Sequence, residues 1–222
     1  MNRIREADDS FRAVSLTTPA RYAEAATLYR EVFGYQDPDY ALNPRLLGAL
    51  ASNGGSVVGI LDESDRLVAF AYGFCGTDRR GFYHYSQSAV VASDQQGHGL
   101  GRMLKHAQRE VALSHGMSRM RWTYDPMLIR NAHFNLDVLG ARGRWFAPDM
   151  YGPGTDRVIV EWDLTREQPS TPSGLTELVV PADAGELRRS FEELLAKGLV
   201  AVSCRRLADG AGAYYFGPAD DA

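Results

Sequence analysis

Three glycines lie within five positions of the stretch VVASDQQGHGLGRMLKHAQ, which runs from Val90 to Gln108. It begins with apolar, β-branched residues typical of a strand and continues into a sequence with helical periodicity. The first N–H groups of a helix have no partner within the helix and carry partial positive charge, and glycines let an anion approach them closely. This spacing favours a phosphate or pyrophosphate site over a turn that only permits tight packing.

The helix after the glycines is predicted to begin near His98 and to pack on a sheet. Its apolar face is formed by Leu100, Met103, Leu104, Ala107 and Val111. Basic side chains lie away from that face at Arg102, Lys105, His106 and Arg109, and we expect the helix surface formed by Arg102, Lys105 and Arg109 to be solvated.

Two common phosphate-binding motifs do not fit this stretch. A Walker loop requires GxxxxGK[ST], but Gly101 is followed by Arg102. The Rossmann fingerprint GxGxxG is broken at Arg102 as well, and the preceding strands are predicted to be antiparallel. A different nucleotide-phosphate binder, which would bind ATP or NAD at this loop, stays as an alternative.

Composition limits the class of protein. The chain has 222 residues, of which 45% are hydrophobic, enough for one core or for a domain with an extension. No apolar run approaches the roughly 18 residues of a membrane helix, and MNRIREADDS lacks the apolar region of a signal peptide. These features predict a soluble cytoplasmic protein with no membrane partner.

Charge and cysteine content exclude further classes. The formal net charge of −4 gives no reason to expect a nucleic-acid partner. Cys75 and Cys204 form no CxxC motif, so neither a disulfide framework nor a zinc ribbon is predicted. The five histidines do not fall at metal-ligand spacing, so no metal is expected.

Periodicity predicts strands and helices in mixed order. Before the glycines we expect a strand at 11–16, helices from 19 to 33 and 44–51, and an antiparallel meander of strands at 56–61, 67–74 and 82–92. After the glycine-led helix we expect a strand at 119–124, a helix at 128–139 that Gly140 stops, and a hairpin at 145–151 and 157–164.

The segment from Gln96 to Gly101 matches the [R/Q]xxGx[G/A] signature, and here the chain resembles the GNAT superfamily of N-acetyltransferases. The order of elements also matches that family over about three quarters of the chain. The run WTYDPMLIRNAHFNLDVLGA is similar to a little-characterised subgroup of predicted acetyltransferases. The resemblance implies an α+β fold with a mixed, mostly antiparallel sheet flanked by helices.

The resemblance also implies an activity, the transfer of an acetyl group from acetyl-CoA to the amine of a small molecule within a ternary complex. The residues that would bind acetyl-CoA are Val90, Val91, Gln96, Gly97, His98, Gly99, Leu100, Gly101, Arg102, Asn131 and Asn135. Val90 and Val91 would supply a backbone N–H to the thioester oxygen. Asn131 and Asn135, one helical turn apart, would reach the pantetheine amides from one face.

Catalytic groups are predicted at His84 and Tyr124. His84 shares a strand face with Ser86 and Ser88 by the period of two and is the expected base, since the reference pKa of histidine is about 6.5. The family's usual acid is a tyrosine whose position falls here on Leu136, so Tyr124 or solvent would protonate the thiolate. The missing tyrosine keeps open a non-catalytic acyl-CoA-binding or sensing module.

The predicted domains are an acetyltransferase domain at 1–165, a linker at 166–174 and a C-terminal extension at 175–222. The extension reads as a strand, a helix at 181–197 and a hairpin, with Leu187, Phe191, Leu194 and Leu195 on one helix side. Because so short a segment is marginal as an independent fold, we expect it to dock on the body or on a second copy, the latter making a homodimer.

Overall fold

The computed structural model describes residues 10–166 and 173–219, apart from the side chain of Pro38. Contacts divide the chain into an N-terminal unit, Met1–Met120, and a C-terminal unit, Arg121–Ala222. The division falls at 120/121, whereas the domain predicted from the sequence ends at 165. Most of the predicted linker lies outside the described residues.

Four antiparallel strands in sequence order form the sheet of the N-terminal unit: β1 (Arg12–Ser15), β2 (Ser56–Leu61), β3 (Leu67–Asp78) and β4 (Gly81–Val91). Its helices are α1 (Pro19–Phe33), α2 (Pro44–Ser52) and α3 (Leu100–Ser114), with short 3₁₀ turns η1 (Pro38–Tyr40) and η2 (Ser93–Gln95). The predicted meander is confirmed, and β3 and β4 run farther toward their common turn than the pattern indicated.

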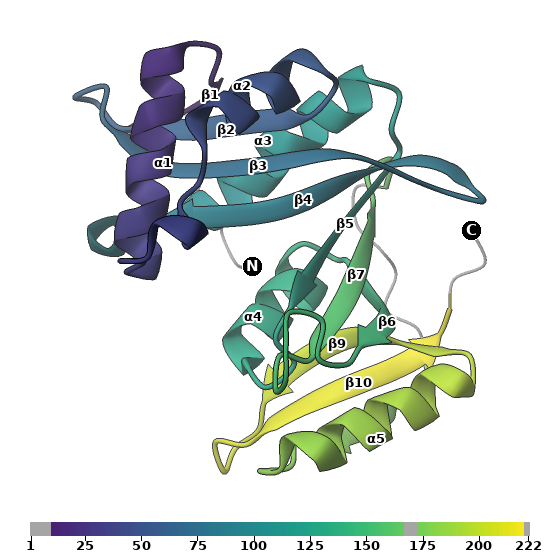
Figure 1. The fold of residues 1–222 in the computed structure, drawn as a ribbon. Helices are drawn as coiled ribbons and strands as arrows, with labels where there is room; N and C mark the ends of the chain where they lie inside the picture. Colours follow the sequence, from purple (N-terminus) through teal and green to yellow (C-terminus); the bar gives the residue numbers. More distant parts are fainter. Residues whose placement is uncertain (1–9, 167–172, 220–222) are drawn as a thin grey trace. The chain divides into compact units, whose positions relative to one another are not determined.

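Two apolar cores hold this sheet between helices (Figure 1). One contains Leu28 of α1 and Leu47 of α2 with Phe70, Tyr72 and Val90 of the sheet. The other contains Leu100 and Leu104 of α3 with strand residues that include Val58, Ile60 and Val68. The α1/α2 face and the α3 face of the sheet are therefore separate environments.

The C-terminal unit has its own strands in the order β5, β7, β6, β9, β10, β8. They are β5 (Arg119–Tyr124), which enters from the first unit, β6 (Arg142–Ala147), β7 (Arg157–Asp163), β8 (Thr176–Val179), β9 (Leu199–Arg206) and β10 (Gly212–Pro218). Helix α5 (Ala184–Ala196) packs on them through Phe191, whose ring contacts those of Phe146, Tyr214 and Phe216.

The extension is joined to the preceding hairpin by an antiparallel pair between Gly143 of β6 and Ala201 of β9. The described residues thus form an α+β fold with a mostly antiparallel sheet, which confirms the predicted fold class.

The segment predicted as one helix at 128–139 has two geometries. An α-helix, α4 (Ile129–His133), is followed by a π-helix, η3 (Phe134–Val138). The Leu139 N–H donates to the Phe134 carbonyl five residues back, and Gly140 ends the segment with a φ of 73°. A π-turn changes the angle between successive side chains, so positions four apart here do not share a face.

Candidate active site

The loop between β4 and α3 has left-handed backbone at two of its glycines. Gly97 and Gly99 adopt φ angles of 91° and 78°, and a Cβ built on either would meet nothing within 4 Å. Left-handed backbone, not close packing, therefore requires glycine at both positions. Gln96, Gly97, His98 and Gly99 are exposed, and the His98 ring lies 5.9 Å from that of Phe11.

Helix α3 begins with open donors. Gly99 is its N-cap and supplies no side chain, and the N–H groups of Arg102 and Met103 donate to the Gly99 carbonyl. Among the described residues, the N–H groups of Leu100 and Gly101 have no backbone acceptor outside the helix. The Leu100 side chain is buried in the core, so only its backbone can serve a ligand. The loop can receive a phosphate from its glycine side.

The end of β4 distinguishes the two predicted thioester donors. The Ala92 N–H donates to the Val68 carbonyl, and Val91 and Val90 are paired with Ala69 and Phe70. Because hydrogen-bonded and non-bonded pairs alternate in an antiparallel ladder, Val90 directs its backbone groups toward β3 and Val91 directs its own away. Val91 is thus the donor with a backbone N–H that β3 does not use.

A β-bulge in β4 changes the predicted sharing of faces. Ser86 is paired with Gly73 and Ser88 with Tyr72, so Gln87 is an extra residue without a partner in β3. Such an insertion reverses the alternation. His84 and Ser86 lie on the α3 face, whereas Ser88 lies on the α1/α2 face, so the expectation that all three share one face was wrong.

A buried polar cluster occupies the α3 face: Ser56, His84, Ser86, Lys105 and Gln108. Lys105 Nζ donates to Ser86 Oγ at 2.8 Å, which donates to Gln108 Oε1 at 2.7 Å. Gln108 Nε2 donates to Ser56 Oγ at 3.0 Å. The Ser56 hydroxyl can then donate its own hydrogen to Nε2 of His84, 2.9 Å away. The hydrogen bonds form one directional chain from the lysine to the histidine.

Burial sets the charges in the buried polar cluster. Removal from water lowers the pKa of Lys105 to about 7. Burial, with repulsion from Lys105 and His115, lowers the pKa of His84 to about 4. His84 is 0% exposed and accepts a hydrogen bond at Nε2, so it is neutral at pH 7 and has no path for an amine in this arrangement. Its role as base stays a prediction.

Sequence reasoning missed Lys105, Gln108 and Ser56 as a group, and the expected solvation of Lys105 was wrong, since only 5% of the residue is exposed. The buried stripe of α3 contains Leu100, Leu104, Lys105, Gln108 and Ala112. This buried stripe is rotated about the helix axis from the predicted apolar face toward Lys105 and Gln108. Serine and histidine at alternate positions of a central strand could have indicated a polar partner on the covering helix.

In the C-terminal unit, Tyr124 is 5% exposed and its hydroxyl is buried. Burial raises the pKa of Tyr124 well above its usual range. A phenol in such a site stays protonated and gives up its proton at high energetic cost, which disfavours an acid role. Leu136, at the position of the family's tyrosine, is buried in the core. The role of Tyr124 as acid also stays a prediction.

The two predicted pantetheine ligands have different surroundings. Asn131 is exposed, whereas Asn135 is buried and its Oδ1 accepts a 2.9 Å hydrogen bond from Trp122 Nε1. The change from α- to π-geometry between them accounts for the difference. Asn135 holds the indole of β5 in place.

Asn135→Leu is therefore expected to lower the free energy of unfolding by about 1–3 kcal/mol, because the buried indole N–H loses this acceptor. Asn131→Leu is the matched control and should change stability by about 0.5 kcal/mol or less. Urea unfolding followed by tryptophan fluorescence measures both. Equal stability of the two variants would contradict a structural role for Asn135.

Two negative findings bound the site. No three histidine, cysteine, aspartate or glutamate side chains of the described chain group as metal ligands. Within residues 10–166 and 173–219, no helix combines the length and apolar character needed to cross a bilayer.

Comparison with known proteins agrees with this geometry. The sequence profile of the Acetyltransferase (GNAT) family matches residues 20–134, more than half of the chain. None of the curated proteins matches the sequence.

Similar solved structures include a Desulfovibrio desulfuricans protein assigned to the GNAT family, with a TM-score of 0.55 and 15% identity over 69% of this chain and 99% of that one. Salmonella typhimurium yncA, solved with acetyl-CoA, has a TM-score of 0.57 and 17% sequence identity, and the match covers 74% of this chain and 99% of yncA. An aminoglycoside 6′-acetyltransferase of type Ii has a TM-score of 0.55 and 15% sequence identity, and the match covers 72% of this chain and 99% of that enzyme. At these identities the likeness concerns the fold, and the profile match carries the assignment: the chain belongs to the GNAT family of acetyltransferases.

Proposed function

We propose that this protein transfers an acetyl group from acetyl-CoA to the amine of a small molecule, directly and within a ternary complex. The observation that carries the proposal is the loop from Gln96 to Gly101, where two left-handed glycines and open N–H groups begin α3. The yncA protein was solved with acetyl-CoA as its cofactor, and other neighbours are aminoglycoside acetyltransferases. Both support a CoA thioester as donor and an amine as acceptor.

The loop would hold the pyrophosphate through the N–H groups of Leu100 and Gly101, with Arg102 as a nearby positive charge. Acetyl-CoA supplies an acetyl group activated as a thioester. The Val91 N–H would stabilise the negative charge that develops on the thioester oxygen. The amine nitrogen bonds to the acetyl carbon as the carbon–sulfur bond breaks, the nitrogen loses a proton and the sulfur gains one.

Proton transfer through solvent suits the surroundings of the two predicted catalytic groups. His84 is fully buried, with a pKa lowered to about 4, so it is a weak base at neutral pH. Burial raises the pKa of Tyr124, so it is a weak acid. We propose that water accepts the proton of the amine and protonates the thiolate.

A non-catalytic acyl-CoA-binding module is a second candidate. The observation that favours it is the buried Leu136 at the family's tyrosine position, together with the burial of Tyr124. Such a module would keep the CoA loop and need no group for proton transfer. The two candidates differ in turnover and not in CoA binding.

Release of free thiol from acetyl-CoA is therefore expected when the protein is incubated with amines. A thiol-reactive dye would follow a panel of primary amines, amino acids and hydrazines, with CoA binding measured in parallel by calorimetry. At least one amine should give saturable release that is absent without protein. CoA binding with no release across the panel would refute the transferase and favour the binding module, and displacement of CoA by ATP or NAD would overturn both.

A further inference from the structure

Six aromatic side chains form a continuous cluster on the α1/α2 face of the N-terminal unit. This aromatic cluster consists of Tyr29, Phe33, Tyr35, Tyr40, Phe70 and Tyr72. Phe33 stacks on Tyr35 at 5.2 Å and Tyr35 on Tyr40 at 5.3 Å between ring centroids. Tyr29 lies 4.7 Å from Phe33 and 6.3 Å from Phe70, so it joins the end of α1 to the sheet.

The aromatic cluster reaches the part of β4 proposed to face the thioester. The Tyr29 hydroxyl lies near that of Ser88, the first residue after the bulge, and Phe70 is paired with Val90. Farther along the same face, the ring of Tyr85 lies 5.2 Å from that of Phe74. The bulge at Gln87 brings Ser88 to this face, three residues before Val91.

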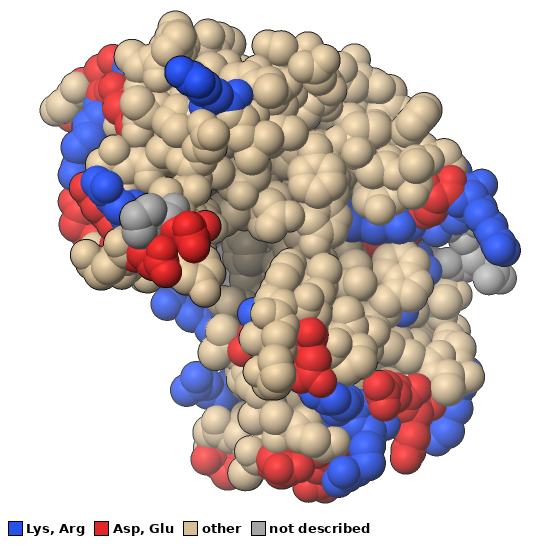
Figure 2. Space-filling model, in the orientation of Figure 1, with Lys and Arg blue, Asp and Glu red and all other residues tan. Residues whose placement is uncertain are grey.

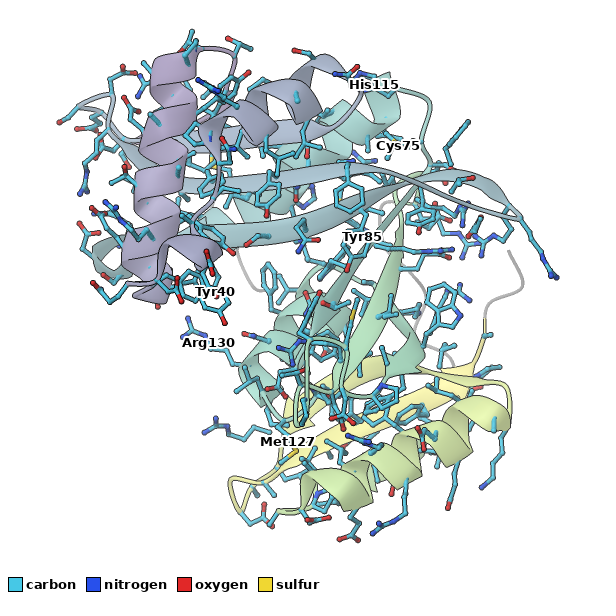
Figure 3. The ribbon with its side chains drawn as sticks, in the orientation of Figure 1. Tyr40, Cys75, Tyr85, His115, Met127 and Arg130 are labelled. Carbon is cyan, nitrogen blue, oxygen red and sulfur yellow. The ribbon has the colours of Figure 1, made fainter. Side chains whose placement is uncertain are left out.

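Part of the aromatic cluster is open to solvent. Phe33 is 45% and Tyr40 63% exposed, and Tyr29 and Tyr35 are half-buried. Figure 3 shows Tyr40 near the end of α1 and Tyr85 on β4. Exposed rings beside one another present flat π surfaces to a ligand, which is more than the packing of α1 requires.

Negative charge lies next to these rings. Asp37 and Asp39 flank Pro38 between Tyr35 and Tyr40, and both are exposed. Neither carboxylate has an ion pair with a lysine or arginine of the described chain. Figure 2 shows red acidic atoms at the end of α1 where this segment lies. The combination complements a cation attached to a flat apolar body.

We propose that the acceptor is an arylalkylamine, a primary amine on a short chain that ends in an aromatic ring. The ring would pack against the exposed rings of Phe33 and Tyr40, the outer members of the stack around Tyr35, and the two carboxylates would attract the protonated amine before it loses its proton. The short chain would let the amine approach Val91 past Tyr29 and Ser88. This inference rests on the proposed function, because it names the acceptor class of the same reaction.

Calorimetric titration of the CoA-bound protein with phenethylamine tests the proposal, with 2-cyclohexylethylamine as a saturated probe of similar size and kanamycin as a polycationic sugar. Phenethylamine is expected to bind at least about threefold more tightly than either. Tyr40→Leu and Phe33→Leu should each weaken phenethylamine binding by roughly fivefold and leave CoA affinity unchanged. Phe82→Leu is the matched control, since Phe82 is 68% exposed but lies outside the aromatic cluster, and should change nothing.

Thiol release in the same samples separates the two proposals. Preferred binding of phenethylamine that Tyr40→Leu weakens, together with thiol release, supports the acceptor class. The same binding without thiol release overturns phenethylamine as an acceptor and leaves it as a bound ligand, and the transferase is then judged on the whole amine panel. Equal or weaker binding of phenethylamine, or affinity that Tyr40→Leu and Phe33→Leu leave unchanged, overturns the acceptor class, and thiol release with kanamycin would then still support the transferase.

Discussion

Gly99→Val is expected to weaken CoA binding by tenfold or more, about 1.4 kcal/mol in binding free energy. Gly99 has a φ of 78°, a conformation that a β-branched residue adopts only with strain. Valine would either keep that backbone and project a branched side chain into the open space over the loop, or shift φ and turn the first N–H groups of α3 away. Both results remove part of the predicted pyrophosphate site.

The control for this variant lies at the other end of the same helix. Gly116 follows α3 with a φ of 75°, and a Cβ there also meets nothing within 4 Å. Gly116→Val should therefore cost similar backbone strain and leave the CoA dissociation constant unchanged. Calorimetry gives the affinity and thermal unfolding the stability of both variants. A folded Gly99→Val protein with wild-type affinity would refute the assignment of the loop.

Lys105→Met is expected to remove a rise in stability between pH 7 and about 10.5. Burial lowers the pKa of Lys105 from its ordinary 10.5 to about 7. Between these values the unfolded chain binds a proton that the folded chain does not, so the free energy of unfolding increases with pH. The difference corresponds to about 5 kcal/mol over the whole window. Methionine fills similar volume without a titrating group.

The free energy of unfolding should also depend on pH through His84, whose pKa is lowered from 6.5 to about 4. Stability from this group is lost as pH falls from 6.5 toward 4, since the unfolded chain is protonated first. Because Lys105 is among the charges that lower the pKa of His84, Lys105→Met should reduce the loss of stability between pH 6.5 and 4. Urea unfolding at several pH values between 4 and 10 measures both effects.

Lys197→Met is the matched control, because Lys197 is the only other lysine of the sequence and is exposed at the end of α5. All other groups are common to the wild-type protein and the Lys105→Met variant, so the comparison at alkaline pH isolates Lys105. Parallel stability curves for wild type and Lys105→Met would show that the buried lysine keeps an ordinary pKa.

Local patterns predicted much of the fold. The strands at 56–61 and 119–124 have the predicted bounds, and α1 begins at Pro19 after a Thr18 side chain that accepts from the Arg21 N–H. These elements depend on alternation, capping and proline placement, which are local properties of the chain. The glycine spacing likewise predicted a turn that leads into a helix, but not the left-handed conformation of Gly97 and Gly99.

The errors have long-range causes. The bulge at Gln87 depends on the register with β3, and the π-turn after His133 accompanies contacts of Asp137 with Ser203 and the Cys204 N–H. Burial of Lys105 depends on Ser86 of another strand. A single sequence carries the period of a helix or strand but not the partner that distorts it. The face of His84 was predicted from the strand period, whereas Tyr124 was chosen because it ends a predicted strand and because the family's tyrosine position falls on Leu136.

The extra residue in β4 has a consequence for how this strand changes in evolution. With Gln87 present, Ser86 and Ser88 belong to different layers, so each position is selected by its own neighbours although only one residue separates them. Loss of the Gln87 codon would remove the bulge and make Ser86 and Ser88 neighbours that still pair with Gly73 and Tyr72, so each would keep its layer. Deletion of a paired residue elsewhere in β4 would instead shift the strand by one position and exchange the residues offered to the two layers. A one-codon deletion at Gln87 should therefore be found more often among descendants of this gene than a one-codon deletion at a paired position of the same strand.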